Sequence, residues 1–217
     1  MKFYTSTTTF PHTWEDMAQT WWCRYPNPHA KHILTEDTVE RHLAAGNADL
    51  LHSKRLIFKS NRMPKWGERF TSARQLPVIE ESIVDRSDRS LIAYTRNIAY
   101  SKMMTVDERV RLEPDPQDPT HRSVLVREAW ISSPLRGLSA LFERFGYERY
   151  KHNASNANKG YIYVLQRFLT VSNSESSQEP ESGKRIRALQ APTEAVKHGK
   201  HPGFRHLPKS VGQQQSA

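Results

Sequence analysis

The strongest constraint on the fold is a helical pattern that runs from about Leu135 to Leu169. Apolar residues recur there at helical spacing, and at 1.5 Å per residue such a helix would span on the order of 50 Å. The middle of the same stripe is polar and contains Arg149, His152, Asn153 and Asn156. Burying such groups without partners costs several kcal/mol. We therefore expect a helix that crosses a whole sheet. At its polar middle this helix is either solvated, kinked at Gly146 or Gly160, or placed opposite an anionic ligand.

The sequence before this helix reads as strands joined mostly by short turns. Seven stretches have strand character: residues 2–10, the stretch after Pro28 to about Leu43, and residues 50–59, 77–84, 91–98, 103–112 and 123–132. Hairpin connections between most of them make the sheet antiparallel. The fold class is therefore α+β, with a seven-stranded antiparallel sheet closed by a long C-terminal helix.

A short amphipathic helix and a rigid corner follow the first strand. Thr13 has the character of an N-cap. One apolar helix face comprises Trp14, Met17, Ala18, Trp21 and Trp22. Pro26 and Pro28 then fix φ, remove two N–H donors and force a stiff corner. The corner holds Arg24, Lys31 and His32 in fixed directions, either as a plain turn or as part of a basic binding floor.

The connection from Ser60 to Leu76 is too long for an ordinary hairpin of about 2–5 residues. It mixes Met63, Trp66 and Phe70 with basic side chains. Compact loops of this size are often functional. The alternative is that the apolar side chains simply pack the loop onto the body.

Composition limits the class of protein without choosing one function. The net charge of +9 suits nucleic acid, an anionic membrane surface or a small anionic ligand. Cys23 is the only cysteine, which excludes an internal disulfide and a thiolate metal site. The sequence contains no apolar run of the roughly 18 residues that a spanning helix needs and no secretory or cleaved mitochondrial presequence pattern.

We expect two regions along the chain. Residues 1–170 carry the alternating and helical patterns and form one domain. Residues 171–217 are polar, basic and rich in Pro, Gly and Gln, which predicts a disordered basic tail.

The motifs of enzymes and metal sites are missing. The sequence has no phosphate-cradling glycine loop, nucleophile elbow or metal-binding H-E-x-x-H. His29 and His32 are an isolated pair without a convincing third ligand. Glu80–Glu81 and Asp107–Glu108 are neighbours in strands and point to opposite faces, so neither is an acid/base pair. We predict no catalysis, cofactor or metal, and scattered basic residues argue against nucleic acid.

Several motifs, in order, resemble the PRELI/MSF1 family of mitochondrial lipid-transfer proteins over about the first 170 residues. They are Arg24-Tyr25-Pro26-Asn27-Pro28, His32-Ile33-Leu34-Thr35-Glu36-Asp37, Asn61-Arg62-Met63-Pro64-Lys65-Trp66, Ile83-Val84-Asp85, Thr95-Arg96-Asn97, Val106-Asp107-Glu108 and Glu128-Ala129-Trp130-Ile131-Ser132-Ser133. The resemblance implies a curved sheet with a lid loop over a lipid cavity. It implies transfer of phosphatidic acid between the outer and inner mitochondrial membranes, in the intermembrane space, in support of cardiolipin synthesis. It further implies a small helical twin-Cx9C protein partner and peripheral contact with anionic membranes.

The resemblance also assigns residues. The head-group positions of the family fall on Arg24, His32, Lys59, Arg62, Arg149 and Asn153. The lid is Ser60–Leu76, and the lid or membrane-contact positions are Met63, Lys65, Trp66, Phe70 and Phe145. One further basic position of the family's helix is Asn156 here, which changes the charge of the pocket.

Elementary energetics fit a carrier of this kind. At about 0.8 kcal/mol per buried CH₂, exposing two long acyl chains to water costs on the order of 20 kcal/mol, so a carrier has to enclose them. A phosphatidylserine carrier and an interaction module with a vestigial pocket remain alternatives. A hydrolase or cyclase on a related helix-grip scaffold is a third, which predicts turnover of a substrate.

Overall fold

The computed structural model describes residues 1–71 and 73–176, with side chains up to residue 170. The strands are β1 Lys2–Phe10, β2 Ile33–Ala44, β3 Asn47–Ser60, β4 Gln75–Asp85, β5 Ser90–Asn97, β6 Thr105–Pro114 and β7 Ser123–Ser132. The helices are α1 Trp14–Thr20, the 3₁₀ turn η1 Trp21–Cys23, α2 Lys65–Glu68 and α3 Ser139–Ser176. No helix in this part of the chain is long and apolar enough to cross a membrane.

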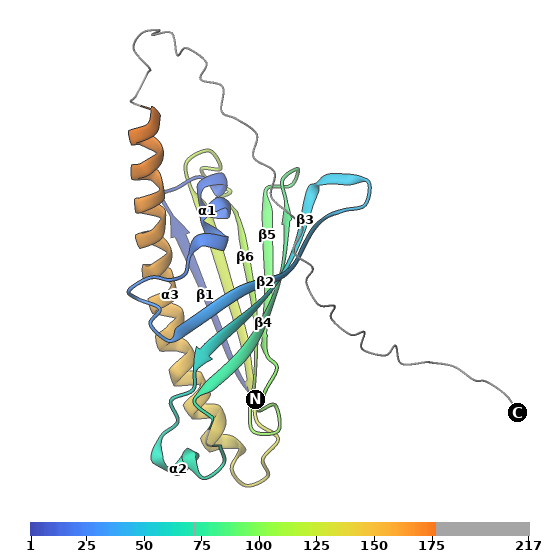
Figure 1. Ribbon diagram of the computed structural model, residues 1–217, viewed down its shortest axis with the longest axis vertical. Coiled ribbons are helices and arrows are strands. Elements are labelled where there is room, and N and C mark those ends of the chain that lie inside the picture. Colours follow the sequence, from blue (N-terminus) through green and yellow to red (C-terminus); the bar gives the residue numbers. More distant parts are fainter. Residues whose placement is uncertain (72, 177–217) are drawn as a thin grey trace, which may run out of the picture. The chain divides into compact units, whose positions relative to one another are not determined.

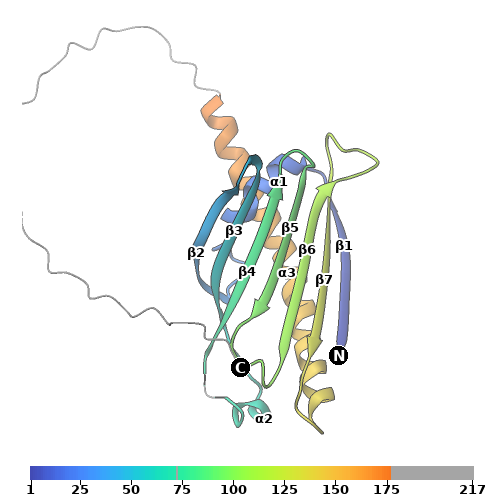
Figure 2. The ribbon, with the colours of Figure 1, turned by 90° about the vertical axis from the view of Figure 1, so that its right-hand side faces the viewer.

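The strands form one antiparallel sheet in the order β1-β7-β6-β5-β4-β3-β2. Each neighbouring pair except β1–β7 is connected directly along the chain, and β1 closes onto β7 from Lys2↔Ile131 to Phe10↔Ser123. The sheet curves, and α3 runs along one of its faces (Figures 1 and 2). The predicted α+β fold, with seven antiparallel strands and a long C-terminal helix, is confirmed.

Two short segments differ from the sequence-based expectation. The β2–β3 turn is tighter than expected because β3 already begins at Asn47, and Gly46 takes a φ of +77° in the turn. Such a φ is strained for residues with a side chain, which explains glycine at this position. The loop between β3 and β4 contains the single helical turn α2, which the sequence pattern does not reveal.

Helix α3 continues without a break through Gly146 and Gly160. Both glycines instead allow close packing. A Cβ on Gly146 would collide with the Met104 sulfur, and one on Gly160 would lie 2.5 Å from Asn27 Oδ1. The helix also continues to Ser176, so residues 171–176 belong to it and not to the predicted tail. The rest of that predicted tail, residues 177–217, lies outside the described residues.

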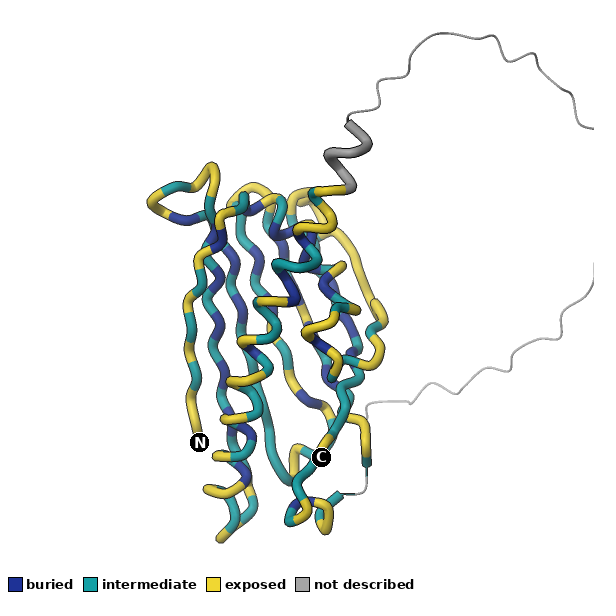
Figure 3. The backbone as a smooth tube through the Cα atoms, turned by 90° about the vertical axis from the view of Figure 1, so that its left-hand side faces the viewer, coloured by how far each residue is buried: buried dark blue, intermediate teal, exposed yellow. Residues whose placement is uncertain are grey.

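The main apolar core lies where α1 and α3 meet the inner face of the sheet. Thr13 caps α1 as predicted, because its Oγ1 accepts a hydrogen bond from Asp16 N at 3.1 Å. Trp14, Met17 and Trp21 are buried in one cluster with Tyr161. The buried positions alternate along the central strands and recur along α3 (Figure 3). This packing fixes α3 across the sheet and positions the polar middle of the helix.

A buried cluster of charges joins β2, β3 and β4 to η1. Arg55 on β3 donates to Glu80 on β4 at 3.1 Å and to Glu36 on β2 at 3.1 Å. Arg24 forms an ion pair with the same Glu80 carboxylate and donates to the Trp21 carbonyl. Two arginines and two carboxylates balance each other, which makes their burial tolerable.

Candidate functional site

A pocket of about 110 Å³ lies between the sheet and the first half of α3. The lining residues are His32, Lys59, Asn61, Met63, Leu76, Val78, Thr95, Asn97, Met104, Val106, Glu108, Phe145, Gly146, Arg149, Tyr150 and Asn153. Apolar side chains dominate towards the β3–β4 loop, and the charged groups gather at the other end.

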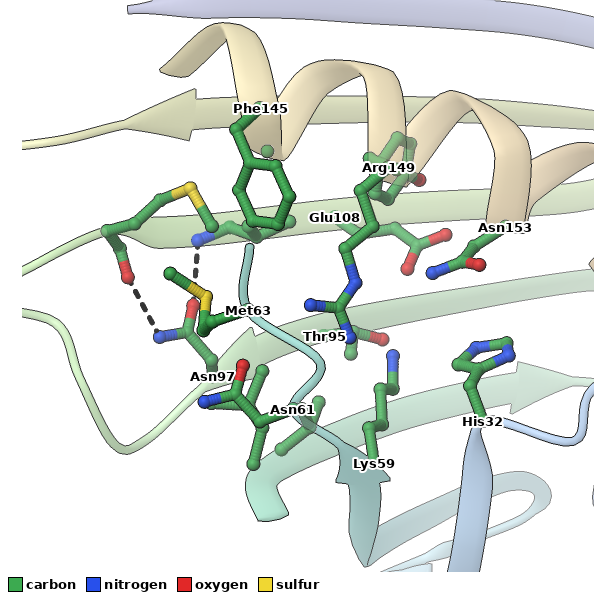
Figure 4. A pocket seen from close by; sticks show the side chains of 16 residues that line it. His32, Lys59, Asn61, Met63, Thr95, Asn97, Glu108, Phe145, Arg149 and Asn153 are labelled. Carbon is green, nitrogen blue, oxygen red and sulfur yellow. Dashed lines mark hydrogen bonds between the residues drawn. The ribbon is translucent and has the colours of Figure 1, made fainter. Parts of the chain in front are cut away.

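Three basic side chains from different elements meet at the polar end. Lys59 is at the end of β3, His32 directly precedes β2, and Arg149 comes from the first half of α3. Their nitrogen-bearing ends face a common space, with Asn153 beside it on the helix (Figure 4). The polar stripe of α3 thus faces a pocket that also holds cations from the sheet. Because two of the three bases come from a sheet edge far away in the sequence, no local pattern reveals this cluster.

Arg149 is held by backbone oxygens. Its guanidinium donates to the carbonyls of Ser60 at 2.6 Å and of Arg62 at 3.1 Å. Burial and the nearby charge of Arg62 lower the pKa of Arg149 from its ordinary value. No carboxylate neutralises it among the ion pairs of the described residues. The site therefore holds a cation that an incoming anion would stabilise.

His32 is kept neutral by the same surroundings. Its burial, followed by the charges of Lys59 and Arg149, lowers its pKa from 6.5 to about 4. A bound anion would act in the opposite direction and favour protonation of the ring. At neutral pH the site therefore presents the charges of Lys59 and Arg149, and His32 would become a further donor on binding of an anion.

The pocket also contains a carboxylate that sequence reasoning did not include. Glu108 on β6 lines the pocket and forms a buried ion pair with Arg127 on β7. Despite its burial, the charges of Arg127 and Lys59 lower the pKa of Glu108. The strand period gives a signal for this position, since Glu108 is in phase with the inward residues Val106 and Val110. Because Arg127 neutralises Glu108, the excess charge of the polar end remains positive.

Four of the six predicted head-group residues line this pocket: His32, Lys59, Arg149 and Asn153. Arg24 lies instead in an adjoining pocket of about 30 Å³, where it is buried and paired with Glu80. The two pockets share Lys59, Thr95 and Glu108 as lining residues. The Arg62 side chain is exposed and does not line the pocket, although its carbonyl binds Arg149. Arg24 and Arg62 therefore do not reach the space that the other four surround.

The residues predicted for the lid or for membrane contact fall into three groups. Met63 and Phe145 line the pocket, and Lys65 is exposed on α2. The Trp66 ring packs edge-on against Phe142 at 5.1 Å and against Phe145 at 5.7 Å, and Phe70 packs on Phe142 at 5.3 Å. The β3–β4 loop comprises residues 61–74. In this conformation its aromatic residues Trp66 and Phe70 pack the loop against α3.

Asn156 contacts a histidine on its own helix, and His29 and His32 have different surroundings. Asn156 Nδ2 lies 3.1 Å from His152 Nε2 on α3. The His29 ring faces Tyr163 at 6.1 Å, whereas His32 lines the pocket. No group of three potential metal ligands occurs among residues 1–71 and 73–176.

A curved antiparallel sheet that packs around one long helix defines a helix-grip fold. One solved structure, TTHA0849 from Thermus thermophilus, shares this fold with a TM-score of 0.53 and 10% identity, over 76% of this chain and 98% of that one. The model of the PRELI-like family matches residues 15–172. The chain belongs to this family.

Individual relatives agree with the family model. PRELI domain-containing protein 1, mitochondrial, from Gallus gallus is 41% identical over 157 residues, which cover 71% of this chain and 72% of that protein. The protein ups1 homolog of Schizosaccharomyces pombe is 27% identical over 155 residues, 71% of this chain and 89% of that protein. Membership of this non-enzymatic, lipid-transfer family confirms the expectation that the chain is not an enzyme.

Proposed function

We propose that this protein is an intermembrane lipid carrier that extracts phosphatidic acid from one mitochondrial membrane and delivers it to the other, in support of cardiolipin synthesis. It would act in the intermembrane space, stabilised by a small helical twin-Cx9C partner. The mitochondrial relatives support the location. The single observation that carries the proposal is the convergence of Lys59, Arg149 and His32 at one end of an apolar pocket.

The charge of the polar end suits a phosphomonoester. Such a group carries about −1 to −2 at neutral pH. Lys59 and Arg149 offer two positive charges, and Asn153 and His32 offer further donors. Charge-assisted hydrogen bonds to a phosphate are stronger than those between neutral groups. A head group with a net charge close to −2 therefore matches this end better than a zwitterionic one.

The apolar end suits acyl chains. Met63, Val78, Met104 and Phe145 line it, and a second apolar pocket adjoins it beneath the β3–β4 loop. The two pockets share Met63, Met104 and Leu76 among their walls. Because Met side chains adapt to irregular shapes, a shift of Met63 and Met104 would join the two spaces. The β3–β4 loop would then act as a lid that opens at the membrane and closes over the chains.

A transfer assay tests the proposal. The full chain, co-expressed with a twin-Cx9C partner, would be mixed with donor and acceptor liposomes that contain labelled phosphatidic acid or phosphatidylserine. Lys59→Glu would abolish phosphatidic acid transfer, because it reverses one of the two charges that face the phosphate. Arg86→Glu is the matched control, since Arg86 is exposed in the β4–β5 turn and the change in net charge is the same.

Each outcome has a defined meaning. Transfer of phosphatidic acid that depends on Lys59 supports the carrier and its pocket. Faster transfer of phosphatidylserine would keep the carrier but replace its cargo. Absence of transfer by a folded complex would favour a non-transferring interaction module, and equal rates for Lys59→Glu and Arg86→Glu would refute the head-group site.

A further inference from the structure

A carboxylate lies inside the pocket beside the cations that suit an anionic ligand. Glu108 on β6 points into the space that is also lined by Lys59, Arg149 and Asn153 (Figure 4). An acidic side chain at this position works against the binding of an anion, because like charges repel. Burying a carboxylate also requires partners that offset its desolvation. The presence of Glu108 therefore needs an explanation other than general attraction of phosphate.

The strand register fixes the direction of the Glu108 side chain. Glu108 pairs with Thr95 on β5, which lines the same pocket, and with Ala129 on β7, which is fully buried. The preceding residue, Asp107, points to the opposite face of the sheet, where it forms an ion pair with the exposed Arg96. Of these two adjacent carboxylates, Glu108 reaches the pocket and Asp107 lies on the outer face.

Groups from three elements face the Glu108 carboxylate. Arg127 on β7 donates to its Oε1 through Nη1. Although burial acts to raise the pKa of Glu108, the charges of Arg127 and of Lys59 on β3 hold that pKa below its ordinary value. Burial, followed by the charge of Glu108, raises the pKa of Tyr150 on α3, so its hydroxyl stays protonated beside the carboxylate. Glu108 is therefore ionised at neutral pH and has donors on the side of the protein.

The carboxylate can accept a further donor from the side of the pocket. A carboxylate offers about four acceptor positions on its two oxygens. Arg127 Nη1 takes one of them, and the Tyr150 hydroxyl faces the same group. An ammonium group, which carries three donors, can still form a charge-assisted hydrogen bond with Glu108. A fully ionised phosphate has no donor to offer and is repelled there.

The charges that face the pocket form a pattern of two positive groups and one negative group. Lys59 and Arg149 are the positive groups, and Glu108 is the negative one. The head group of phosphatidylserine carries the complementary set, namely a phosphate, a carboxylate and an ammonium. A phosphomonoester carries about −1 to −2 and no positive group. Glu108 therefore shifts the balance towards an amino head group, whereas Lys59 and Arg149 favour both lipids.

We propose that Glu108 sets the head-group specificity of the pocket: it accepts a hydrogen bond from the ammonium of an amino-phospholipid and repels a doubly charged phosphomonoester. This inference rests on the proposed carrier function and adds a specificity-determining residue to its site. Lys59 and Arg149 supply affinity for the phosphate of either lipid, and Glu108 limits how far phosphatidic acid is preferred. The ion pair with Arg127 makes the burial of this charge tolerable.

Loading with two short-chain lipids tests this role. The full chain, co-expressed with a twin-Cx9C partner, would be titrated in solution with short-chain phosphatidic acid and with short-chain phosphatidylserine. Glu108→Gln should bind phosphatidic acid about tenfold more tightly and phosphatidylserine about tenfold more weakly, which is the size of effect expected for one charge-assisted hydrogen bond. A loss of packing would move both affinities in the same direction. Opposite changes therefore identify a specificity residue.

Asp107→Asn is the matched control, because it removes the same charge from the neighbouring residue on the outer face. Both of its affinities should stay within about twofold of those of the unaltered protein. A ratio of the two affinities in Glu108→Gln equal to that in Asp107→Asn would overturn the specificity role. If Glu108→Gln fails to fold because Arg127 loses its partner, Glu108→Gln with Arg127→Gln takes its place. This double variant keeps the net charge and should still bind phosphatidylserine about tenfold more weakly, so an unchanged ratio would again overturn the role.

The specificity role and the carrier function fail in different ways. If Glu108→Gln changes the ratio but the folded complex transfers neither lipid, the carrier is refuted and the specificity role stands. If transfer of phosphatidic acid depends on Lys59 while the ratio does not depend on Glu108, the carrier stands and the specificity role is refuted. If the unaltered protein binds neither lipid, both are refuted.

Discussion

Arg149 Nη2 donates to the Ser60 carbonyl at 2.6 Å, so α3 is tied to the last residue of β3, where the β3–β4 loop begins. The same guanidinium reaches the Arg62 carbonyl at 3.1 Å. One side chain therefore holds the base of the loop and supplies charge to the pocket. These two roles can be separated by substitution.

Arg149→Lys should keep the charge but lose the planar fork that reaches both carbonyls. We expect affinity for short-chain phosphatidic acid to fall about tenfold, since a charge-assisted bond contributes about 1.5–3 kcal/mol. Amide hydrogen exchange in residues 61–71 should quicken, because the base of the loop loses an anchor. Titration calorimetry and exchange measurements test this, with the exposed Arg86→Lys as control. Exchange rates equal to those of the control would contradict the anchoring role.

His32 should make stability depend on pH in a defined range. Because its folded-state pKa of about 4 lies below the ordinary 6.5, the unfolded chain binds more protons between these values. The stability that accompanies a neutral His32 is complete above about pH 6.5 and is lost as the pH falls towards 4. Urea unfolding from pH 4 to 8 should therefore show a weaker pH dependence in His32→Asn. The exposed His29→Asn should keep the dependence of the unaltered protein.

Glu80 should be far more important for stability than its neighbour Glu81. Glu80 is buried between Arg24 and Arg55, whose charges hold its pKa below the ordinary value despite burial. Glu80→Gln would leave an uncompensated buried cation and cost about 3–5 kcal/mol of unfolding free energy. Glu81→Gln removes only the exposed pair with Lys54 and should cost less than about 1 kcal/mol. If chemical denaturation gave similar losses of unfolding free energy for Glu80→Gln and Glu81→Gln, Glu80 would not be coupled to the two buried arginines.

Trp66→Ala should slow extraction of lipid from membranes more than it weakens lipid binding. The Trp66 ring packs against Phe142 and Phe145, so in the proposed carrier it would reach a membrane only when the β3–β4 loop opens. Stopped-flow transfer from vesicles measures extraction, and loading with short-chain phosphatidic acid measures binding. Equal losses in both would make Trp66 a packing residue only.

Most of the architecture can be predicted from the sequence because the strand alternation, the turns and the helical stripe are local. Thr13 as the N-cap and the opposite facing of Glu80 and Glu81 follow from periods of a few residues. The ion pair of Arg24 with Glu80 cannot be predicted from such periods. It depends on the strand register, which places Arg55 opposite Glu80 across β3 and β4. A basic residue near a binding motif reads the same in sequence whether it faces a ligand or a buried carboxylate. For this reason the sequence predicts Arg24 at the head group as readily as Lys59, and only Lys59 lines the main pocket.

Gly160 sets the contact between α3 and the proline corner. A Cβ on Gly160 would lie 2.5 Å from Asn27 Oδ1 and 2.6 Å from its Nδ2. Both atoms are engaged, because Nδ2 donates to the Arg24 carbonyl at 2.6 Å and Oδ1 accepts from His29 N at 2.9 Å. Gly160→Ala would displace Asn27 and cost about 1–3 kcal/mol for the groups left unpaired.

A double-mutant cycle separates this contact from helix propensity. In an Asn27→Gly background the obstacle is gone, so Gly160→Ala should stabilise the protein by up to about 1 kcal/mol, the usual gain of Ala over Gly within a helix. Urea denaturation of the four proteins measures the coupling. An equal effect of Gly160→Ala in both backgrounds would mean that Gly160 does not hold α3 against the corner. A change of sign would establish that this glycine sets the distance between the helix and the segment leading to His32.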